Sequence, residues 1–248
     1  MNPLLIVPVV VLLLASCTEV KKSEDVKSDE ISQRYRCTYR PDGSGTLTAD
    51  FLLNATWDRL AEEKHSDSYV DFGEKSPVTC NGMDMKREEG SLSGVYYTCS
   101  FPAGTREITI VWTDKDGKKY THKAPLYPFE LISDEDKKDW MGDNWKVKWK
   151  GEPSNSNSRV KVTLKGRDNT VTNDKKDKYI YESEFAEKDG DNFVLFTAQR
   201  LRNMKGSLEV TAKRTTCIRL TEVTKGEGSL KVEGDGGEYN TSSGGILF

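Results

Sequence analysis

The stretch Leu208-Glu209-Val210-Thr211-Ala212-Lys213 decides the fold class, because apolar and polar side chains alternate along it one for one. Successive side chains of a β-strand point to opposite faces of its sheet, whereas a helix needs apolar residues three and four positions apart. The alternation is typical of a strand with one face buried and the other in water. The sequence therefore predicts a half-buried strand over 208–213.

The same period of two recurs along the chain and predicts an all-β protein. Segments of this kind are separated by turn-forming residues such as Pro41–Gly45 and Asp114–Gly117, at a spacing of roughly 8 to 12 residues. Short strands at this spacing are typical of antiparallel β-sandwiches. The predicted strands span residues 34–40, 46–53, 69–72, 78–85, 95–101, 108–112, 119–123, 145–149, 160–165, 179–185, 193–196, 208–213, 218–223 and 230–232, with a helical corner at 198–204.

The proline-rich stretch Ala124-Pro125-Leu126-Tyr127-Pro128 predicts a domain boundary. Proline fixes an extended backbone and has no N–H for a β-ladder. We therefore expect a first domain over 34–124, a linker over 125–128, and a second domain over 129–248 that ends in a Gly/Ser-rich segment. A chain of 248 residues is long enough for two domains of about 100–150 residues each.

The chain opens with an apolar run, residues 4–15, that ends at Leu14-Ala15-Ser16-Cys17. The run is too short to cross a bilayer, which takes about 20 apolar residues, and it fits the core of a signal peptide. Its last four residues resemble the lipobox of bacterial lipoproteins. The resemblance implies a signal peptide over 1–16, lipid on the Cys17 sulfur and, with Thr18 next rather than Asp, the outer membrane. An ordinary secretory signal and an uncleaved apolar N-terminus remain alternatives.

The segment that follows, residues 18–33, is rich in Lys, Glu, Asp and Ser, with isolated valines. Such a composition buries too little apolar surface to offset the entropy lost on ordering. The sequence therefore predicts that 17–33 consists of the lipidated Cys17 and a disordered tether that holds the folded domains away from the membrane.

Four further cysteines, Cys37, Cys80, Cys99 and Cys217, predict two disulfides in an oxidising compartment, with three connectivities possible. Cys80 and Cys99 lie in neighbouring predicted strands, which favours that pair and leaves Cys37 with Cys217. Buried thiols and a metal site are the alternatives. The chain has no Cys-x-x-Cys spacing and only two histidines, so no zinc site is predicted.

Several segments together carry a resemblance to a group of proteins. They are Val78-Thr79-Cys80-Asn81-Gly82, Tyr96-Tyr97-Thr98-Cys99-Ser100-Phe101, Thr113-Asp114-Lys115-Asp116-Gly117, and the strand–corner–strand order of Phe193–Arg214. They resemble those of Gram-negative lipoproteins with tandem immunoglobulin-like or fibronectin-type-III-like domains. The resemblance implies two tandem immunoglobulin-like antiparallel β-sandwiches after the signal peptide and tether. It implies neither an activity nor catalytic residues, because a fold does not determine a function.

The sequence shows no constellation of residues that predicts catalysis, a cofactor or a nucleic-acid partner. The 37 basic and 40 acidic residues are mixed throughout, without a long basic block. No Gly-x-Ser-x-Gly motif is present, so we interpret His65 as a solvated loop histidine and His122 as a surface side chain of a strand. Asp114-x-Asp116-Gly117 is interpreted as a hairpin turn rather than a calcium loop, because lysines follow it where a loop needs oxygen ligands.

Three tryptophans of the second half are candidates for ligand contact, because carbohydrate modules stack sugars on exposed aromatic rings. Trp145 and Trp149 share a strand face with Val147, which predicts that both lie in the core. Trp140 is then the tryptophan expected to be exposed.

These observations lead to two main hypotheses of function. The first is a non-enzymatic, membrane-anchored envelope lipoprotein that binds another envelope protein or has a structural role through its loops and strand edges. The alternative is an accessory protein that binds carbohydrate or peptidoglycan through exposed aromatics of the second domain. A hydrolase with an unrecognised site is a third hypothesis.

Overall fold

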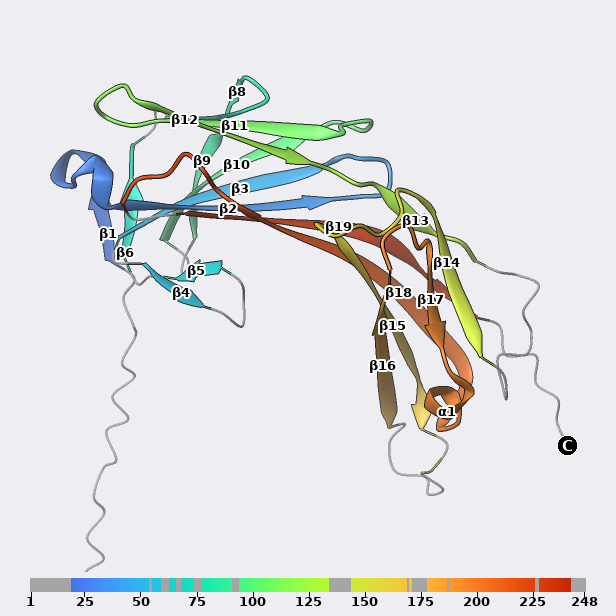
Figure 1. Ribbon diagram of the computed structural model, residues 1–248. Coiled ribbons are helices and arrows are strands. Elements are labelled where there is room, and N and C mark those ends of the chain that lie inside the picture. Colours follow the sequence, from blue (N-terminus) through green and yellow to red (C-terminus); the bar gives the residue numbers. More distant parts are fainter. Residues whose placement is uncertain are drawn as a thin grey trace, which may run out of the picture.

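The computed structural model describes residues 19–53, 55–58, 63–65, 68–73, 77–90, 94–133, 144–168, 170, 178–186, 188–225 and 228–241 (Figure 1). Its strands are β1 (Glu19–Lys22), β2 (Ile31–Tyr39), β3 (Gly45–Leu53), β4 (Thr56–Asp58), β5 (Glu63–His65), β6 (Ser68–Asp71), β7 (Val78–Cys80), β8 (Met83–Asp84), β9 (Lys86–Gly90), β10 (Gly94–Phe101), β11 (Glu107–Thr113), β12 (Lys119–Pro125), β13 (Phe129–Leu131), β14 (Trp145–Gly151), β15 (Arg159–Asp168), β16 (Tyr179–Phe185), β17 (Phe193–Phe196), β18 (Met204–Arg219) and β19 (Gly228–Asn240). The helical elements are two 3₁₀ turns, Ser23–Asp25 and Ser28–Glu30, and helix α1 (Ala198–Leu201).

One long sheet of ten strands runs through the described part of the molecule, in the order β1-β6-β3-β2-β19-β18-β15-β16, with β10 beside β3 and β9 beside β10. Strand β19 lies at its centre, antiparallel to β18 and parallel to β2. Figure 1 shows that this long sheet bends along its length and that the two larger of the remaining sheets lie on the convex side of the bend.

Two hydrophobic clusters lie between the long sheet and these smaller sheets. The first is covered by the sheet β12-β11-β7-β8 and contains Trp112, whose ring stacks on Tyr120 at 4.7 Å between centroids. The second is covered by β13-β14-β17 and contains Trp149, which is 0% exposed. Each half of the protein therefore consists of two β layers, in which a smaller sheet covers one face of the long sheet.

The prediction of a mostly β protein is confirmed, but the tandem immunoglobulin-like arrangement is not. The two halves share one sheet, because β18 and β19 extend over 16 and 13 residues and contribute to both clusters. Leu230 and Val232 pack in the first cluster although they follow the predicted linker 125–128 by about a hundred residues. The chain therefore returns to its first half at the end.

Two glycines of β19 allow aromatic rings to pack closely where the halves meet. A Cβ at Gly234 would lie 2.4 Å from the ring of Tyr39, and one at Gly236 would lie 2.3 Å from the ring of Phe129. The buried Arg214 guanidinium lies 4.9 Å from the Phe129 centroid and donates to the carbonyl of Glu152. Only glycine fits at these two positions without displacing a buried ring.

The segment expected to be a disordered tether is structured from Glu19 onward. Strand β1 pairs in parallel with β6, and the 3₁₀ turns lead directly into β2. Val26 is 6% exposed and belongs to the first cluster, while its carbonyl accepts a hydrogen bond from Lys115 Nζ at 2.7 Å. One buried valine and backbone pairing therefore order a segment whose charged side chains stay in water. Among the described residues, no helix combines the length and apolarity needed to cross a membrane.

Candidate functional site

The tryptophan predictions have different outcomes. Trp145 and Trp149 are 3% and 0% exposed, so both belong to the second cluster as predicted. Trp140 lies outside the described residues, as does the proposed lipidation site Cys17. The tryptophans that the structure describes in the second half are thus part of the core and do not form a binding platform.

The predicted Cys37–Cys217 disulfide does not fit the structure. Cys37 of β2 is the register partner of Val232 and is buried, whereas Cys217 of β18 is the register partner of Lys231 and is exposed. Val232 and Lys231 are consecutive in β19, so the two cysteines point to opposite faces of the long sheet and are separated by a whole strand. Two strand spacings of about 4.8 Å exceed the Cα separation that a disulfide spans.

Cys80 and Cys99 are close together, as predicted, but they are present as thiols. Cys80 ends β7 of the small sheet and Cys99 lies in β10 of the long sheet. Burial raises the pKa of Cys80 to about 12, with a further contribution from the charge of Cys99 and a hydrogen bond with it. Cys37 also lies near Cys80, and burial followed by the charge of Cys80 raises its pKa to about 12. A Cys80–Cys99 disulfide stays a prediction.

The other residues considered for chemistry have structural positions. The Asp114 carboxylate accepts hydrogen bonds from the backbone N–H groups of Asp116 and Lys118 at 3.0 and 2.9 Å, which confirms the hairpin turn. The prediction that His122 is a surface side chain is wrong, because His122 is buried on β12, with Nε2 2.9 Å from Gln33 Oε1. No group of three or more metal-ligating side chains occurs within the described ranges.

A row of exposed aromatic side chains marks a different candidate site, on β16. Tyr179, Tyr181 and Phe185 are 44%, 63% and 51% exposed. They occupy alternate positions of the strand and therefore point to one side, at intervals of about 7 Å for two residues and about 13 Å for four. We call these three residues the aromatic row. β16 is the last strand in the order of the long sheet, so the row lies along an edge of that sheet.

The aromatic row belongs to the face of the long sheet opposite the hydrophobic clusters, which we call the open face. Strand register places Tyr181, Lys165, Glu209 and Asn240 side by side across β16, β15, β18 and β19. Along each of these strands, the residues on the open face alternate with residues that point into the core, such as Leu164 on β15. The open face therefore presents polar and aromatic side chains to solvent over four strands.

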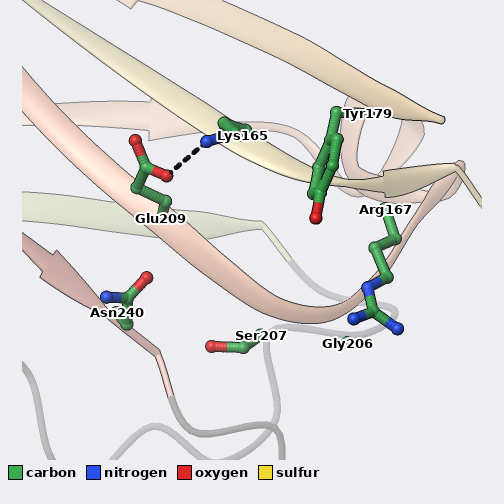
Figure 2. Close-up of a pocket in the computed structure, with 7 residues that line it drawn as sticks. All are labelled: Lys165, Arg167, Tyr179, Gly206, Ser207, Glu209 and Asn240. Atoms are coloured by element: carbon green, nitrogen blue, oxygen red, sulfur yellow. Dashed lines mark hydrogen bonds and ion pairs between the residues drawn. The ribbon is translucent and has the colours of Figure 1, made fainter. Parts of the chain in front are cut away.

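A hollow of about 440 Å³ lies at one end of the open face (Figure 2). The residues that line it are Lys165, Arg167, Tyr179, Gly206, Ser207, Glu209 and Asn240. Lys165 Nζ is 2.6 Å from Glu209 Oε2, and this hydrogen bond raises the pKa of Lys165. Lys165 also lies 5.3 Å from the Tyr179 ring centroid. The hollow thus combines an aromatic wall with a charged pair, a hydroxyl and an amide.

Sequence reasoning missed the aromatic row because it identified 179–185 only as a strand. The signal was present: Tyr179, Tyr181 and Phe185 make one face of β16 more apolar than the other, which has Ile180 followed by two glutamates. Burial of the more apolar face is the usual outcome. Here Ile180 packs against the second cluster and the aromatics are exposed, which is the kind of departure expected at a functional surface.

Comparison with known proteins gives no family for the chain. No family model and no curated protein matches it. Among solved structures, a tri-modular GH5 (subfamily 4) endo-β-1,4-glucanase from Bacillus licheniformis is 12% identical over 82% of this chain and 38% of that chain, with a TM-score of 0.30. SGBP-B of the mixed-linkage glucan utilization locus of Bacteroides ovatus, in complex with a mixed-linkage heptasaccharide, is 12% identical over 87% of this chain and 66% of that chain, with a TM-score of 0.20.

The chain spans about two fifths of the length of the glucanase chain. TM-scores of 0.30 and 0.20 do not establish a common fold, and they assign no ligand to this protein. The side chains of the open face are therefore what indicates a ligand.

Proposed function

We propose that the protein binds glycans through the open face of its long sheet, with the aromatic row as the main contact. The observation that carries the proposal is the exposure of Tyr179, Tyr181 and Phe185 along one sheet edge. A sugar ring has a face of C–H groups that packs on an aromatic ring, and hydroxyls that need hydrogen-bond partners. A chain of sugars lying along β16 meets both requirements.

The hollow beside the row provides the hydrogen-bonding partners. The Lys165 ammonium donates and the Glu209 carboxylate accepts, so the pair can bind neighbouring hydroxyls of one sugar. Ser207 and Asn240 add a hydroxyl and an amide to the lining of the same hollow (Figure 2). Tyr179 belongs to both the hollow and the row. The geometry thus allows one sugar to enter the hollow while the next ones stack along the strand.

Replacing the aromatic row tests this function. We expect Tyr181→Ala and Phe185→Ala each to weaken glycan binding about tenfold or more, because exposed aromatic anchors contribute a large share of binding energy at such surfaces. Binding is measured by affinity electrophoresis against a panel of soluble polysaccharides. The melting temperature should stay close to that of the wild type, because both side chains are more than half exposed.

The matched control is Phe193→Ala. Phe193 begins β17 on the opposite side of the same half and has Lys146 4.6 Å from its ring centroid, as Phe185 has Lys161 at 5.8 Å. We expect the control to bind like the wild type. If Phe193→Ala lowers binding as much as Phe185→Ala does, or if no polysaccharide retards the wild type, the proposal is wrong.

We also propose that the protein is a non-enzymatic lipoprotein of the bacterial envelope, anchored at the outer membrane through lipid on Cys17. The support is the apolar run 4–15 that ends at Cys17, and the two or more acyl chains of a lipoprotein are enough for durable anchoring. Strand β1 begins only two residues later, at Glu19, and lies at the other end of the strand order from β16. The sheet itself then separates the anchor from the aromatic row.

The anchor is tested by detergent phase separation of whole cells. We expect the wild type in the detergent phase and Cys17→Ser in the aqueous phase, because the variant lacks the sulfur that carries the lipid. Recovery of both proteins in the aqueous phase would contradict lipidation.

A further inference from the structure

The strand next to the aromatic row carries a row of basic side chains. On β15 the residues that point to the open face include Arg159, Lys161, Lys165 and Arg167, of which the first, second and fourth are exposed. Register places Lys161 beside Phe185, Lys165 beside Tyr181 and Arg167 beside Tyr179. Every residue of the aromatic row therefore has a cation as its neighbour across the ladder.

On β16 and β18, the two strands that flank β15, a single acidic side chain points to the open face. Glu182 and Glu184 of β16 lie on its opposite face, where Arg200 of α1 pairs with them at 3.7 and 3.2 Å. Strand β18 adds Lys205 and Lys213 to the open face and one carboxylate, Glu209, which is paired with Lys165. Positive charge thus predominates beside the aromatic row, although the whole chain has a formal charge of −3.

The excess of basic side chains beside the aromatic row indicates a charged ligand, because a neutral glycan has no anionic group that could pair with them. Neutral sugars bind through hydroxyls, for which one donor–acceptor pair such as Lys165–Glu209 is sufficient. A row of exposed cations gains energy only from anionic groups that repeat along the ligand. Arginine in particular pairs with carboxylates in bidentate fashion, and Arg167 is one of the residues that line the hollow.

We infer that the ligand is an acidic polysaccharide, in which sugar rings carry carboxylates. The inference rests on the proposed glycan-binding function and specifies its substrate class. Ring faces stack on Tyr179, Tyr181 and Phe185, while carboxylates lie against Lys161 and Arg167. Single-stranded nucleic acid also combines stacking with negative charge and is one of the outcomes of the test below.

A matched pair of polymers tests the inference. We expect polygalacturonate to retard the wild type in affinity electrophoresis, and its fully methyl-esterified form, which has the same backbone without charge, to bind at least about tenfold more weakly. The retardation should decrease as salt is raised from 50 to 500 mM, roughly the range over which exposed charges become screened. Alginate and purified cell-wall sacculi serve as two further acidic glycans and separate a free polysaccharide from the cell wall as the source.

Variants that lack positive charges of β15 show whether these residues bind the acidic polymer. The double variant Lys161→Gln, Arg167→Gln should bind polygalacturonate about tenfold more weakly and lose most of the salt dependence. The control Lys146→Gln removes a lysine that lies over an aromatic ring in the same way, at 4.6 Å, but on the other face of this half. It should bind like the wild type.

The outcomes are distinguishable. Equal binding of the acidic and esterified polymers, abolished by Tyr181→Ala, would retain the glycan-binding function and overturn the acidic ligand. Absence of binding to every polysaccharide and to sacculi would overturn both. Tighter binding of poly(dT) than of any acidic glycan, lost in the same variants, would overturn both and identify the open face as a nucleic-acid surface.

Discussion

Lowering the pH from 7 to 5 is expected to reduce the free energy of unfolding by about 2 kcal/mol through His122 alone. Burial lowers the pKa of His122 to about 4 from an ordinary value of 6.5, against a smaller opposing effect of Glu222. The folded protein therefore resists protonation while the unfolded chain accepts it. The contribution of His122 to the free energy of unfolding is fully present above about pH 6.5 and is lost as the pH decreases towards 4. The loss there reaches about 3 kcal/mol, at 1.36 kcal/mol per pKa unit.

The surroundings of His122 explain why it stays neutral. Its ring lies 5.6 Å from that of Tyr35, and Nε2 faces Gln33 Oε1, which also accepts a hydrogen bond from the Tyr35 hydroxyl at 2.9 Å. Neither neighbour carries a charge that would stabilise an imidazolium. Paired carboxylates such as Asp71, whose pKa the side-chain hydrogen bonds of Arg87 lower below 3.8, do not titrate between pH 7 and 5.

Urea denaturation at pH 7, 6 and 5 measures this effect. The variant His122→Asn keeps an amide donor towards Gln33 but has no titrating ring, so its stability should change little between pH 7 and 5. The variant will be less stable than the wild type at pH 7, so only the change of the free energy of unfolding with pH is compared between the two proteins. Parallel slopes for the two proteins would show that His122 is not the group responsible.

Oxidation of Cys80 and Cys99 to a disulfide is expected to raise the free energy of unfolding by about 3 kcal/mol, the entropic value for a loop of about 20 residues. The bond would join β7 of the small sheet to β10 of the long sheet. Cys99 is partly exposed, so an added oxidant such as hydrogen peroxide converts its thiol to a sulfenic acid first. The Cys80 thiolate then attacks the Cys99 sulfur, which forms the S–S bond and releases the sulfenic oxygen as water. The raised pKa of Cys80, about 12, keeps its thiol protonated at neutral pH and makes the reaction faster in alkaline buffer.

Peptide mapping without reductant, together with denaturation with and without reductant, measures this prediction. Cys37→Ser should still form the Cys80–Cys99 bond and gain stability on oxidation, whereas Cys99→Ser should not gain any. A linked Cys37–Cys80 peptide in the wild type would contradict the pairing, because Cys37 is the other thiol near Cys80.

Local patterns were sufficient for several elements of the fold. The alternation around Val147 predicted the burial of Trp145 and Trp149, and the turn chemistry of Asp114 predicted the hairpin between β11 and β12. The helical corner predicted at 198–204 begins with α1, which spans Ala198–Leu201. Each of these features depends on residues a few positions apart, and this is the range over which strand period and turn chemistry act.

The long sheet and the candidate site depend on partners that local patterns do not specify. Nothing in 228–240 indicates that this strand pairs with 33–39, so the sequence suggested two separate domains. For β16, the period of two places Tyr181 and Ile180 on opposite faces of the strand, but it does not determine which of the two faces is buried. The neighbour strand β15 decides that, because Leu164 faces inward and Lys165 outward.

The parallel pairing of β19 with β2 also determines when the protein can fold. Leu230 is the register partner of Tyr35, so the first hydrophobic cluster closes only when residues nearly two hundred positions apart in the chain come together. Contacts of such high contact order form slowly, since loop closure precedes the energy gained. Strand β2 meanwhile exposes the edge that β19 will occupy. We therefore expect the first half to complete its folding only once β19 has been synthesised.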